Sequence, residues 1–457
     1  MSDNIALRSW RLVPYAYYVK NVRNAKGLNA DEYELLQKCD GSNEIPDSEL
    51  LRTLLAKGLV RPAKAGETLS LWQKPLKCDN RYFPAMNLMI TERCNYNCLH
   101  CFNASDSSHL QNEFTLEEAQ KLIDEAAECG INAFTITGGE PMIHSHFIEI
   151  LRTIYDRGMY VEELNTNGFF LTRDVLDTMK TIDCYPLIKI SFDGIGHHDW
   201  LRDRKGAEED ALRAIKLCVQ NGFRVKVQSN VHRKNVQSML ATAILLNDIG
   251  VEEMRIIRTT ESPRWVQNAG DACLTFEEYF GTMLEFIKDY VKTNCNMEID
   301  IWQFVHVSNA NKVYRPEAVL CGMGEYRDTL PVCKGNRGMI AVSANGNLYP
   351  CLQQSGLYDV RGWCLGNVKK DGLKKHLREG AYLDSVCMTV KELAEHNSKC
   401  SACRWFKYCC GGCRVVALAK ANDIFAADPS SCLYFEGGYM QKLETALKGY
   451  TNLLPIQ

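Results

Sequence analysis

The sequence predicts an α/β protein. Its centre is a partial (β/α)6 barrel of the TIM type, which follows a winged helix-turn-helix domain and precedes a cysteine-rich, metal-organised domain. Three observations lead to this prediction. Short apolar runs alternate with longer amphipathic runs between residues 84 and 260, as in repeated βα units. Residues 1–82 lack this rhythm, and cysteines crowd together over 321–432. A chain of 457 residues is also too long for one hydrophobic core.

Composition excludes several classes of protein. With 53 basic and 56 acidic residues the formal charge is -3, so no general basic field predicts binding to nucleic acid. No apolar run approaches the 18 residues that a membrane span needs, and the first residues lack the apolar core of a signal peptide. A cytoplasmic protein without a membrane partner is therefore expected. Its 21 cysteines, an odd number in a reducing compartment, favour metal binding over complete disulfide pairing.

The N-terminal segment 1–82 reads as an extended start followed by two helices and a strand. Helices are expected over 29–39, capped by Asn29, and over 47–58, with a strand over 59–62. This order predicts a winged helix-turn-helix. The second helix carries as many acids as bases, which argues against DNA binding, and a packing module without a ligand is the other alternative.

The barrel, residues 83–295, has six predicted strands. They span 86–91, 133–137, 161–165, 188–192, 225–231 and 254–259, with helices such as 115–129 between them. Six units fit a partial barrel better than a closed one of eight. Glycines, asparagines, acids and cysteines follow the strands at their C-terminal ends, where parallel barrels bind ligands.

After a helix over 276–292, the βα rhythm ends. We expect a bridging region over 296–320, the cysteine-rich domain over 321–435, and a closing helix with a tail over 436–457.

The first cysteine group is C-x3-C-x2-C, formed by Cys94, Cys98 and Cys101 directly after the first predicted barrel strand. A [4Fe-4S] cluster has four irons, so three thiolates from one loop leave one iron open to another ligand. Zinc completed by His100 is an alternative, as is a disulfide.

Together with Gly-Gly-Glu-Pro at 138–141, this group resembles the radical S-adenosylmethionine (SAM) enzymes. The resemblance implies that the open iron chelates SAM, which is cleaved reductively to a 5'-deoxyadenosyl radical. It further implies that Gly138, Gly139 and Glu140 hold the SAM amino group, that Ser191 meets its ribose or carboxylate, and that Arg202 pairs with its carboxylate. The other residues that it assigns to SAM are Pro141, Asn167, Asp193 and Asn230. For Ser191 and Asn167, simple turn capping is the alternative. The family usually has an aromatic residue where this chain has His100.

The second cysteine group is Cys333-x12-Gly346-x4-Cys351, then Cys400-x2-Cys403-x5-Cys409-x3-Cys413, and finally Cys432. The 345–351 segment is expected to form a hairpin turn. The pattern resembles the SPASM domain, which holds two auxiliary [4Fe-4S] clusters and would bring the total to three.

The SPASM resemblance also implies which cysteines bind which cluster. Cys333, Cys351 and Cys413 would bind the first auxiliary cluster, and Cys400, Cys403, Cys409 and Cys432 the second. Cys321 is the expected fourth ligand of the first cluster, unless an open iron there takes a substrate thiol. Cys410 could replace Cys409. Zinc is the alternative for the C-x2-C-x5-C-x3-C run taken alone.

These resemblances imply a peptide-modifying enzyme that abstracts hydrogen from a ribosomally made precursor peptide and forms a thioether. A carbon-carbon crosslink or another oxidation is the alternative. Leu352 stands where sulfatase-maturing enzymes carry a base, which argues against that activity. A non-catalytic iron-sulfur relay and a redox-responsive DNA-binding regulator are further alternatives.

The expected partners are the precursor peptide and an electron donor such as flavodoxin or ferredoxin. The N-terminal segment resembles the leader-recognition domain of peptide-maturing enzymes, where a leader adds as a strand, here expected along residues 10–22. No catalytic base stands out in the sequence.

Overall fold

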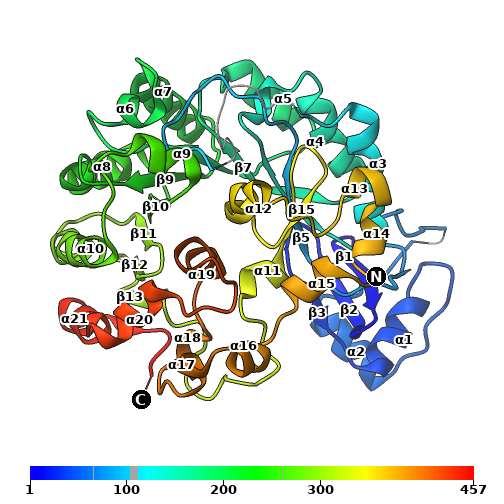
Figure 1. The fold of residues 1–457 in the computed structure, drawn as a ribbon. Helices are drawn as coiled ribbons and strands as arrows, with labels where there is room; N and C mark the ends of the chain where they lie inside the picture. The colour runs from blue at the N-terminus through cyan, green and yellow to red at the C-terminus, as the bar shows by residue number, and fades with distance from the viewer. Residues whose placement is uncertain (65, 103–111, 260, 457) are drawn as a thin grey trace.

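The computed structural model describes residues 1–64, 66–102, 112–259 and 261–456. Within these ranges the strands form two sheets, one of four strands with the order β3-β2-β1-β4 and one of twelve. Figure 1 shows the helices that follow the barrel strands, such as α4, α5 and α7, along the outer side of the large curved sheet. No helix in this part of the chain is long and apolar enough to cross a membrane.

The N-terminal module contains both predicted helices, α1 (Ala30–Lys38) and α2 (Glu49–Ala56). Asn29 caps α1 in a capping box with Glu32. Its strands are β1 (Ile5–Trp10), β2 (Val13–Val19), β3 (Lys26–Gly27) and β4 (Leu76–Lys77). The strand predicted over 59–62 is wrong: Gly58 turns the chain with φ 70° and the amide of Leu59 donates back to the carbonyl of Leu54. The winged helix-turn-helix assignment stays a prediction.

The predicted edge over residues 10–22 is also wrong. β2 pairs with β1 on one side and with β3 on the other, where Ala16 and Tyr17 face Gly27 and Lys26. The chain reverses near Asn21, which has φ 59°, and folds back over its own strand. Among the described strands, β3 and β4 therefore form the edges of this sheet.

The module is held against the barrel by buried hydrogen bonds. The Trp10 indole donates to the carbonyl of Cys129 (2.9 Å) and the Tyr18 hydroxyl to that of Gly130 (2.9 Å). A Cβ at Gly130 would lie 2.8 Å from the Trp10 ring, so glycine is required by this close approach. The two parts of the chain therefore pack as neighbours with an ordered contact.

Trp10→Ala should loosen this contact. Removing a buried indole and its hydrogen bond is expected to lower the free energy of unfolding by about 3–5 kcal/mol and to expose the segment around residue 79 to trypsin. Limited proteolysis measures the effect, with Leu12→Ala as the control because the Leu12 side chain is 68% exposed. Equal cleavage rates in the two variants would contradict the docking role of Trp10.

The six predicted barrel strands are confirmed, with boundary shifts of one or two residues. They are β5 (Ala85–Met89), β6 (Ala133–Thr137), β7 (Tyr160–Thr166), β8 (Leu187–Ser191), β9 (Val225–Val231) and β10 (Glu253–Arg258). Two more parallel strands extend the run, β14 (Ile340–Val342) beside β5 and β11 (Glu298–Ile301) beside β10. The predicted bridging region thus contributes to the sheet, as do β12 (Val305–Ser308) and β13 (Val313–Pro316), while β15 (Leu348–Tyr349) and β16 (Thr451–Asn452) lie at its two ends.

The helices complete the architecture. Those around the barrel are α3 (Leu116–Glu128), α4 (Phe147–Asp156), α5 (Arg173–Thr181), α6 (His198–Arg202), α7 (Ala207–Gln220), α8 (Met239–Ile249), α9 (Pro263–Asn268) and α10 (Phe276–Tyr290). The C-terminal region has α11 (Lys334–Gly338), α12 (Ser355–Val360), α13 (Val368–Asp371), α14 (Leu373–His376), α15 (Ala381–Val386), α16 (Val390–His396), α17 (Ser398–Ser401), α18 (Phe406–Cys409), α19 (Arg414–Ala421), α20 (Pro429–Glu436) and α21 (Tyr439–Ala446).

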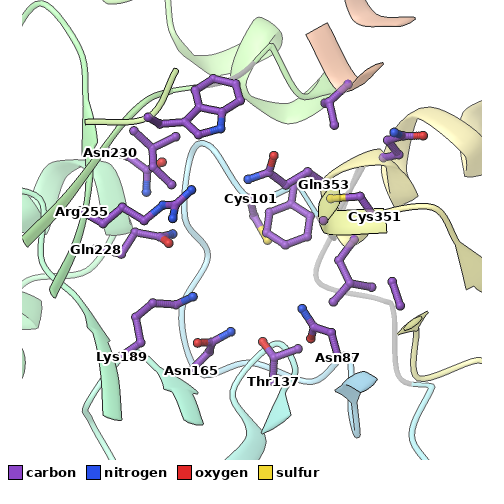
Figure 2. Close-up of a pocket in the computed structure, with 18 of the residues that line it drawn as sticks. Asn87, Cys101, Thr137, Asn165, Lys189, Gln228, Asn230, Arg255, Cys351 and Gln353 are labelled. Carbon is purple, nitrogen blue, oxygen red and sulfur yellow. The ribbon is translucent and has the colours of Figure 1, made fainter. Parts of the chain in front are cut away.

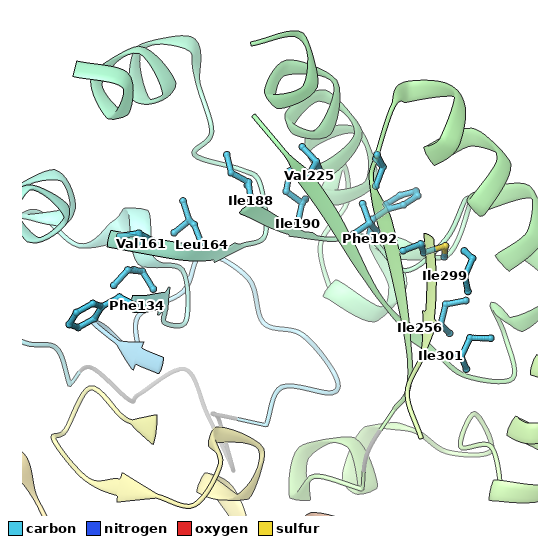
Figure 3. Packing of buried hydrophobic residues seen from close by; sticks show 14 of the residues in the cluster. Phe134, Val161, Leu164, Ile188, Ile190, Phe192, Val225, Ile256, Ile299 and Ile301 are labelled. Carbon is cyan, nitrogen blue, oxygen red and sulfur yellow. The ribbon is translucent and has the colours of Figure 1, made fainter. Parts of the chain in front are cut away.

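The barrel strands separate polar from apolar residues by alternation. Inward positions such as Asn165, Lys189 and Gln228 point into an open interior (Figure 2). The intervening positions, such as Ile188 and Ile190, are fully buried in the main hydrophobic core between the sheet and its helices (Figure 3). This division leaves the interior of the barrel available for a polar ligand.

Candidate functional site

A cavity of about 1020 Å³ lies at the C-terminal ends of the barrel strands. Both cysteine groups contribute to its wall: Cys94, Cys98 and Cys101 from the loop after β5, and Cys333, Cys351 and Cys413 from the C-terminal region. In Figure 2, Cys101 and Cys351 lie across the interior from residues of β8–β10. Two motifs more than 200 residues apart therefore face one open cavity.

The first cysteine loop is fixed from both sides. The amide of Leu99 donates to the carbonyl of Leu201 (3.0 Å), and the Arg264 guanidinium donates to the carbonyl of Cys98 (2.9 Å). Desolvation by the surrounding wall raises the pKa of the Cys94 thiol to about 12 and that of Cys98 to about 11, while Cys94 stays open to the cavity. Thiolates in this environment need a positively charged partner such as a metal centre.

These residues fit an iron-sulfur cluster. Three thiols of one short loop border an open cavity. Within the described ranges no three His, Cys, Asp or Glu side chains converge as closely as one metal ion requires. Such an arrangement suits a larger group held by three separated thiolates better than a mononuclear zinc site.

The Gly-Gly-Glu-Pro loop packs directly against the cysteine loop. A Cβ at Gly138 would lie 2.7 Å from the carbonyl oxygen of Thr91, and one at Gly139 would lie 2.4 Å from that of Arg93. The amide of Glu140 donates to the same Arg93 carbonyl (2.9 Å). Glycine is thus required because the two loops approach closely, and both glycines line the cavity.

Glu140 lies behind the cavity wall, and its assignment to the SAM amino group stays a prediction. It is fully buried, and its carboxylate accepts hydrogen bonds from the Thr166 hydroxyl (2.9 Å) and the Asn167 amide (2.8 Å), two residues that do line the cavity. Burial raises the pKa of Glu140 to about 7. Its oxygens accept these hydrogen bonds, so in this structure Glu140 holds Thr166 and Asn167 in place.

We expect Glu140→Gln to weaken SAM binding by about tenfold, because one acceptor of the Thr166 and Asn167 hydrogen bonds is lost. Acidification should mimic this change, since protonation below about pH 7 removes the same negative charge. SAM affinity measured by calorimetry should therefore fall more steeply from about pH 8 to about pH 6 in the wild type than in the variant, in which only the amino group of SAM still titrates over this range. The same decline in both proteins would contradict this role of Glu140.

Asp193 is a second buried positioning group. It accepts hydrogen bonds from Arg202 Nε (2.7 Å), from the His198 ring (2.9 Å) and from the amide of Asn230 (2.8 Å). Burial alone would raise the pKa of Asp193, but the Arg202 charge and the His198 hydrogen bond outweigh it and hold the pKa well below its usual range. Arg202 Nη1 lies 3.9 Å from the Cys98 sulfur. Asp193 therefore aims Arg202 at the cysteine loop.

The structure brings most of the predicted SAM residues together. Those that line the cavity are Gly138, Gly139, Asn167, Ser191, Arg202 and Asn230. Those that lie outside its wall are Glu140, Pro141, which begins a short 3-10 helix (Pro141–Ile143), and Asp193.

The C-terminal cysteines fall into two places. Cys351 follows the predicted hairpin, which is confirmed as β14 and β15 turning at Gly346 with φ 89°. Cys413 precedes α19, and its amide donates to Asp428 (2.8 Å). The other predicted set, Cys400, Cys403, Cys409 and Cys432, lies outside the cavity wall, around α17, α18 and α20.

Cys321 is held near the second of these sets. Its amide donates to the carbonyl of Tyr408 (3.1 Å), and the residue is fully buried in one apolar cluster with Cys400 and Cys410. It does not line the cavity that Cys333, Cys351 and Cys413 share. Its role as the fourth ligand of the first auxiliary cluster stays a prediction.

The wall also contains residues that sequence analysis missed. They are mostly carboxamides and cations: Asn87, Asn165, Gln228, Gln303, Asn336, Gln353, Gln354, Lys189 and Arg255. The available signal was the polar alternation within apolar strands, such as Lys189 between Ile188 and Ile190. Alternation shows that a side chain faces the interior of the barrel, but it does not show whether that interior holds a cavity or which ligand binds there.

Comparisons with known proteins agree with the two cysteine patterns. Residues 88–246 match the family model of the radical SAM superfamily, and residues 333–404 match that of the SPASM iron-sulfur cluster-binding domain. The AdoMet-dependent heme synthase of Methanosarcina barkeri is 27% identical over 359 residues, 76% of this chain and 95% of that protein. The subtilosin biosynthesis protein AlbA of Bacillus subtilis is 30% identical over 40% of this chain and 39% of its own.

Among solved structures, Streptococcus suis SuiB bound to the precursor peptide SuiA has a similar fold. The TM-score is 0.66 at 13% identity, and the match covers 94% of this chain and 99% of that one.

Proposed function

We propose that this radical SAM enzyme, which carries a SPASM domain, abstracts hydrogen from a ribosomally made precursor peptide and forms a thioether crosslink. The observation that carries the proposal is the single cavity lined by Cys94, Cys98 and Cys101 together with Cys333, Cys351 and Cys413. When bound, SAM and its cluster supply a 5'-deoxyadenosyl radical, and auxiliary clusters can accept an electron. A substrate in this cavity would have both within reach.

The chemistry of the wall favours a peptide. The side-chain oxygens of Asn87, Asn165, Gln303 and Gln354 are buried without a hydrogen-bond partner in the described part of the chain. All four residues line the cavity. A carboxamide both donates and accepts hydrogen bonds, as a peptide group does, so these side chains are suited to hold a peptide backbone.

The N-terminal module supports the same proposal. Arg23, which follows β2, reaches the cavity wall and donates to Glu162 of β7 (2.7 Å). A leader held by this module would keep its attached core segment at a high effective concentration near the cavity. With β2 inside the sheet, β3 is the available edge for a leader strand on this side.

A tetrapyrrole-modifying enzyme is the second candidate, because 95% of the heme synthase aligns with this chain. That match, however, leaves out about a quarter of the 457 residues. The likeness to SuiB leaves out only 6%, about 27 residues, and so includes much of the 82-residue N-terminal module. The likeness to SuiB over nearly the whole chain, against the shorter match to the heme synthase, favours a peptide substrate.

Thioether formation needs a thiol proton, a hydrogen atom from carbon and one electron to leave the substrate. The hydrogen atom would go to the deoxyadenosyl radical and the electron to an auxiliary cluster. Reducing equivalents for SAM cleavage would come from a flavodoxin or ferredoxin. Leu352 lines the cavity next to Cys351, in the position where a sulfatase-maturing enzyme would have its base. A carbon-carbon crosslink is the alternative product.

The test uses anaerobically reconstituted enzyme, SAM, dithionite and cysteine-containing peptides encoded beside the gene. If a thioether forms, the peptide loses the mass of two hydrogens, and one cysteine thiol can no longer be alkylated by iodoacetamide. Loss of two hydrogens with every thiol still alkylated would indicate a carbon-carbon crosslink. An unchanged peptide together with conversion of iron-coproporphyrin would overturn the proposal in favour of the second candidate.

A further inference from the structure

The cavity wall is strongly asymmetric in charge. Seven basic residues line it, against two acidic residues, Glu92 and Glu317. Both acids are already engaged, Glu92 with Asn112 (2.7 Å) and Glu317 with Arg315 (2.7 Å). The space therefore presents mainly cationic groups to whatever enters it.

Most of these cations have a task elsewhere. Arg202 and Arg264 contact the first cysteine loop, and Arg414 donates to backbone carbonyls such as that of Ala426 (2.7 Å). Arg93 and Arg23 come from outside the barrel strands and pair with Glu113 and Glu162. Lys189 of β8 and Arg255 of β10 are the cations that the barrel strands themselves present, on the wall that faces the cysteines (Figure 2).

The strand register places these two cations next to the predicted SAM position. Ser191 is level with Gln228 on β9, and Gln228 is level with Arg255 on β10. Two strand spacings put the Cα atoms of Ser191 and Arg255 about 10 Å apart. Lys189 is two residues before Ser191 on the same inward face of β8. A group bound between the two cations would lie beside a ligand that contacts Ser191.

Each cation is anchored from behind and keeps donors for the cavity. Lys189 donates to Glu163 (2.7 Å) and Arg255 to Asp300 (2.8 Å), and neither acid lines the cavity. An ammonium has three N–H donors and a guanidinium five, so each has donors left over. The anchoring pairs fix the direction of both side chains and lower the entropy cost of binding a further group.

We propose that Lys189 and Arg255 form a carboxylate-binding subsite, and that the substrate places a carboxylate next to the carbon that loses hydrogen. In a peptide, that carboxylate is the side chain of an aspartate or glutamate. A guanidinium and an ammonium together suit a carboxylate, because charge-assisted hydrogen bonds are short and strong. This inference rests on the proposed function for the identity of the substrate, but the carboxylate chemistry does not depend on it.

The first arm of the test uses random twelve-residue peptides displayed on mRNA and selected on the reconstituted enzyme with S-adenosylhomocysteine. The wild type should enrich aspartate or glutamate at one position relative to the Lys189→Met/Arg255→Met variant. Peptides made from the enriched sequences should bind the variant at least about tenfold more weakly. Equal enrichment in both proteins, or none in the wild type, would overturn the subsite.

Lys226→Met is the matched control. Lys226 lies on β9 between the same strands and pairs with Glu253, but it does not line the cavity. The Lys226→Met variant should bind the selected peptides as the wild type does. The iron content of each variant verifies that it is folded and carries its clusters. Equal loss of binding in the control would show that any broken ion pair suffices and would overturn the specific role of Lys189 and Arg255.

The second arm uses coproporphyrin III and its tetramethyl ester, with binding followed by porphyrin fluorescence. One possible result is that the free acid binds the wild type and binds the double variant at least about tenfold more weakly, while the ester does not bind. In that case the carboxylate subsite stands and the peptide function fails. If only the selected acidic peptides show this dependence, both proposals stand. If porphyrin binding is equal in all variants, and peptide binding also does not depend on Lys189 and Arg255, the subsite is contradicted.

Discussion

Replacement of Cys98 by alanine is expected to abolish 5'-deoxyadenosine formation and to lower the iron content from about twelve to about eight atoms per chain. Cys98 is held by two arginines: Arg202 Nη1 lies 3.9 Å from its sulfur, and Arg264 donates to its carbonyl. Because one loop supplies all three thiols, the loss of one leaves a cluster with two protein ligands. Iron analysis and chromatographic detection of the nucleoside measure both effects.

Cys364→Ser is the control for this experiment. Cys364 is exposed and lies outside all predicted ligand sets and outside the cavity wall. It should keep the wild-type iron content and SAM cleavage. Residual 5'-deoxyadenosine formation at more than about one per cent of the wild-type rate in Cys98→Ala would contradict the assignment of this loop to the SAM cluster.

Cys413→Ala is expected to separate SAM cleavage from product formation. Cys413 lines the cavity with Cys333 and Cys351, and it belongs to a different predicted ligand set from the first cysteine loop. Iron should fall to about eight atoms per chain, 5'-deoxyadenosine should still form, and crosslinked peptide should disappear because the substrate electron has no acceptor nearby. Iron content, nucleoside yield and peptide mass are measured on one sample.

Two results would contradict this account of Cys413. Crosslinked peptide at the wild-type yield would show that the first auxiliary cluster is not the electron acceptor. An unchanged iron content would show that Cys413 is not a ligand. Cys364→Ser again gives the comparison, because Cys364 is exposed, belongs to no predicted ligand set and lies outside the cavity wall.

The barrel could be predicted from the sequence because its strands are long and alternate with amphipathic helices. β6 and β9 match their predicted bounds, and the other four strands differ by one or two residues at their ends. β11 and β14 were missed because they are short, four and three residues, and gain their stability from pairing with β10 and β5. Local pattern alone cannot report a partner strand that is distant in sequence.

Site residues that belong to a sequence motif could be predicted. The positions of other site residues depend on which side chains become buried, and the sequence does not show this. The cysteine spacings identified the thiols that line the cavity, and Gly138 and Gly139 lie where two loops must touch. Glu140 and Asp193, in contrast, carry charges that suit SAM, yet both are buried behind the wall as acceptors for neighbouring residues. Which side of a loop a carboxylate takes depends on packing, and the sequence does not specify it.

The most direct test of the central account follows a single hydrogen atom. A precursor peptide encoded beside the gene is made with deuterium at its carbon-bound positions and incubated anaerobically with enzyme, SAM and dithionite. A substrate held in the shared cavity predicts deuterium in 5'-deoxyadenosine, in proportion to peptide that has lost one carbon-bound deuterium and one thiol proton. Unlabelled 5'-deoxyadenosine together with an unmodified peptide would contradict the account.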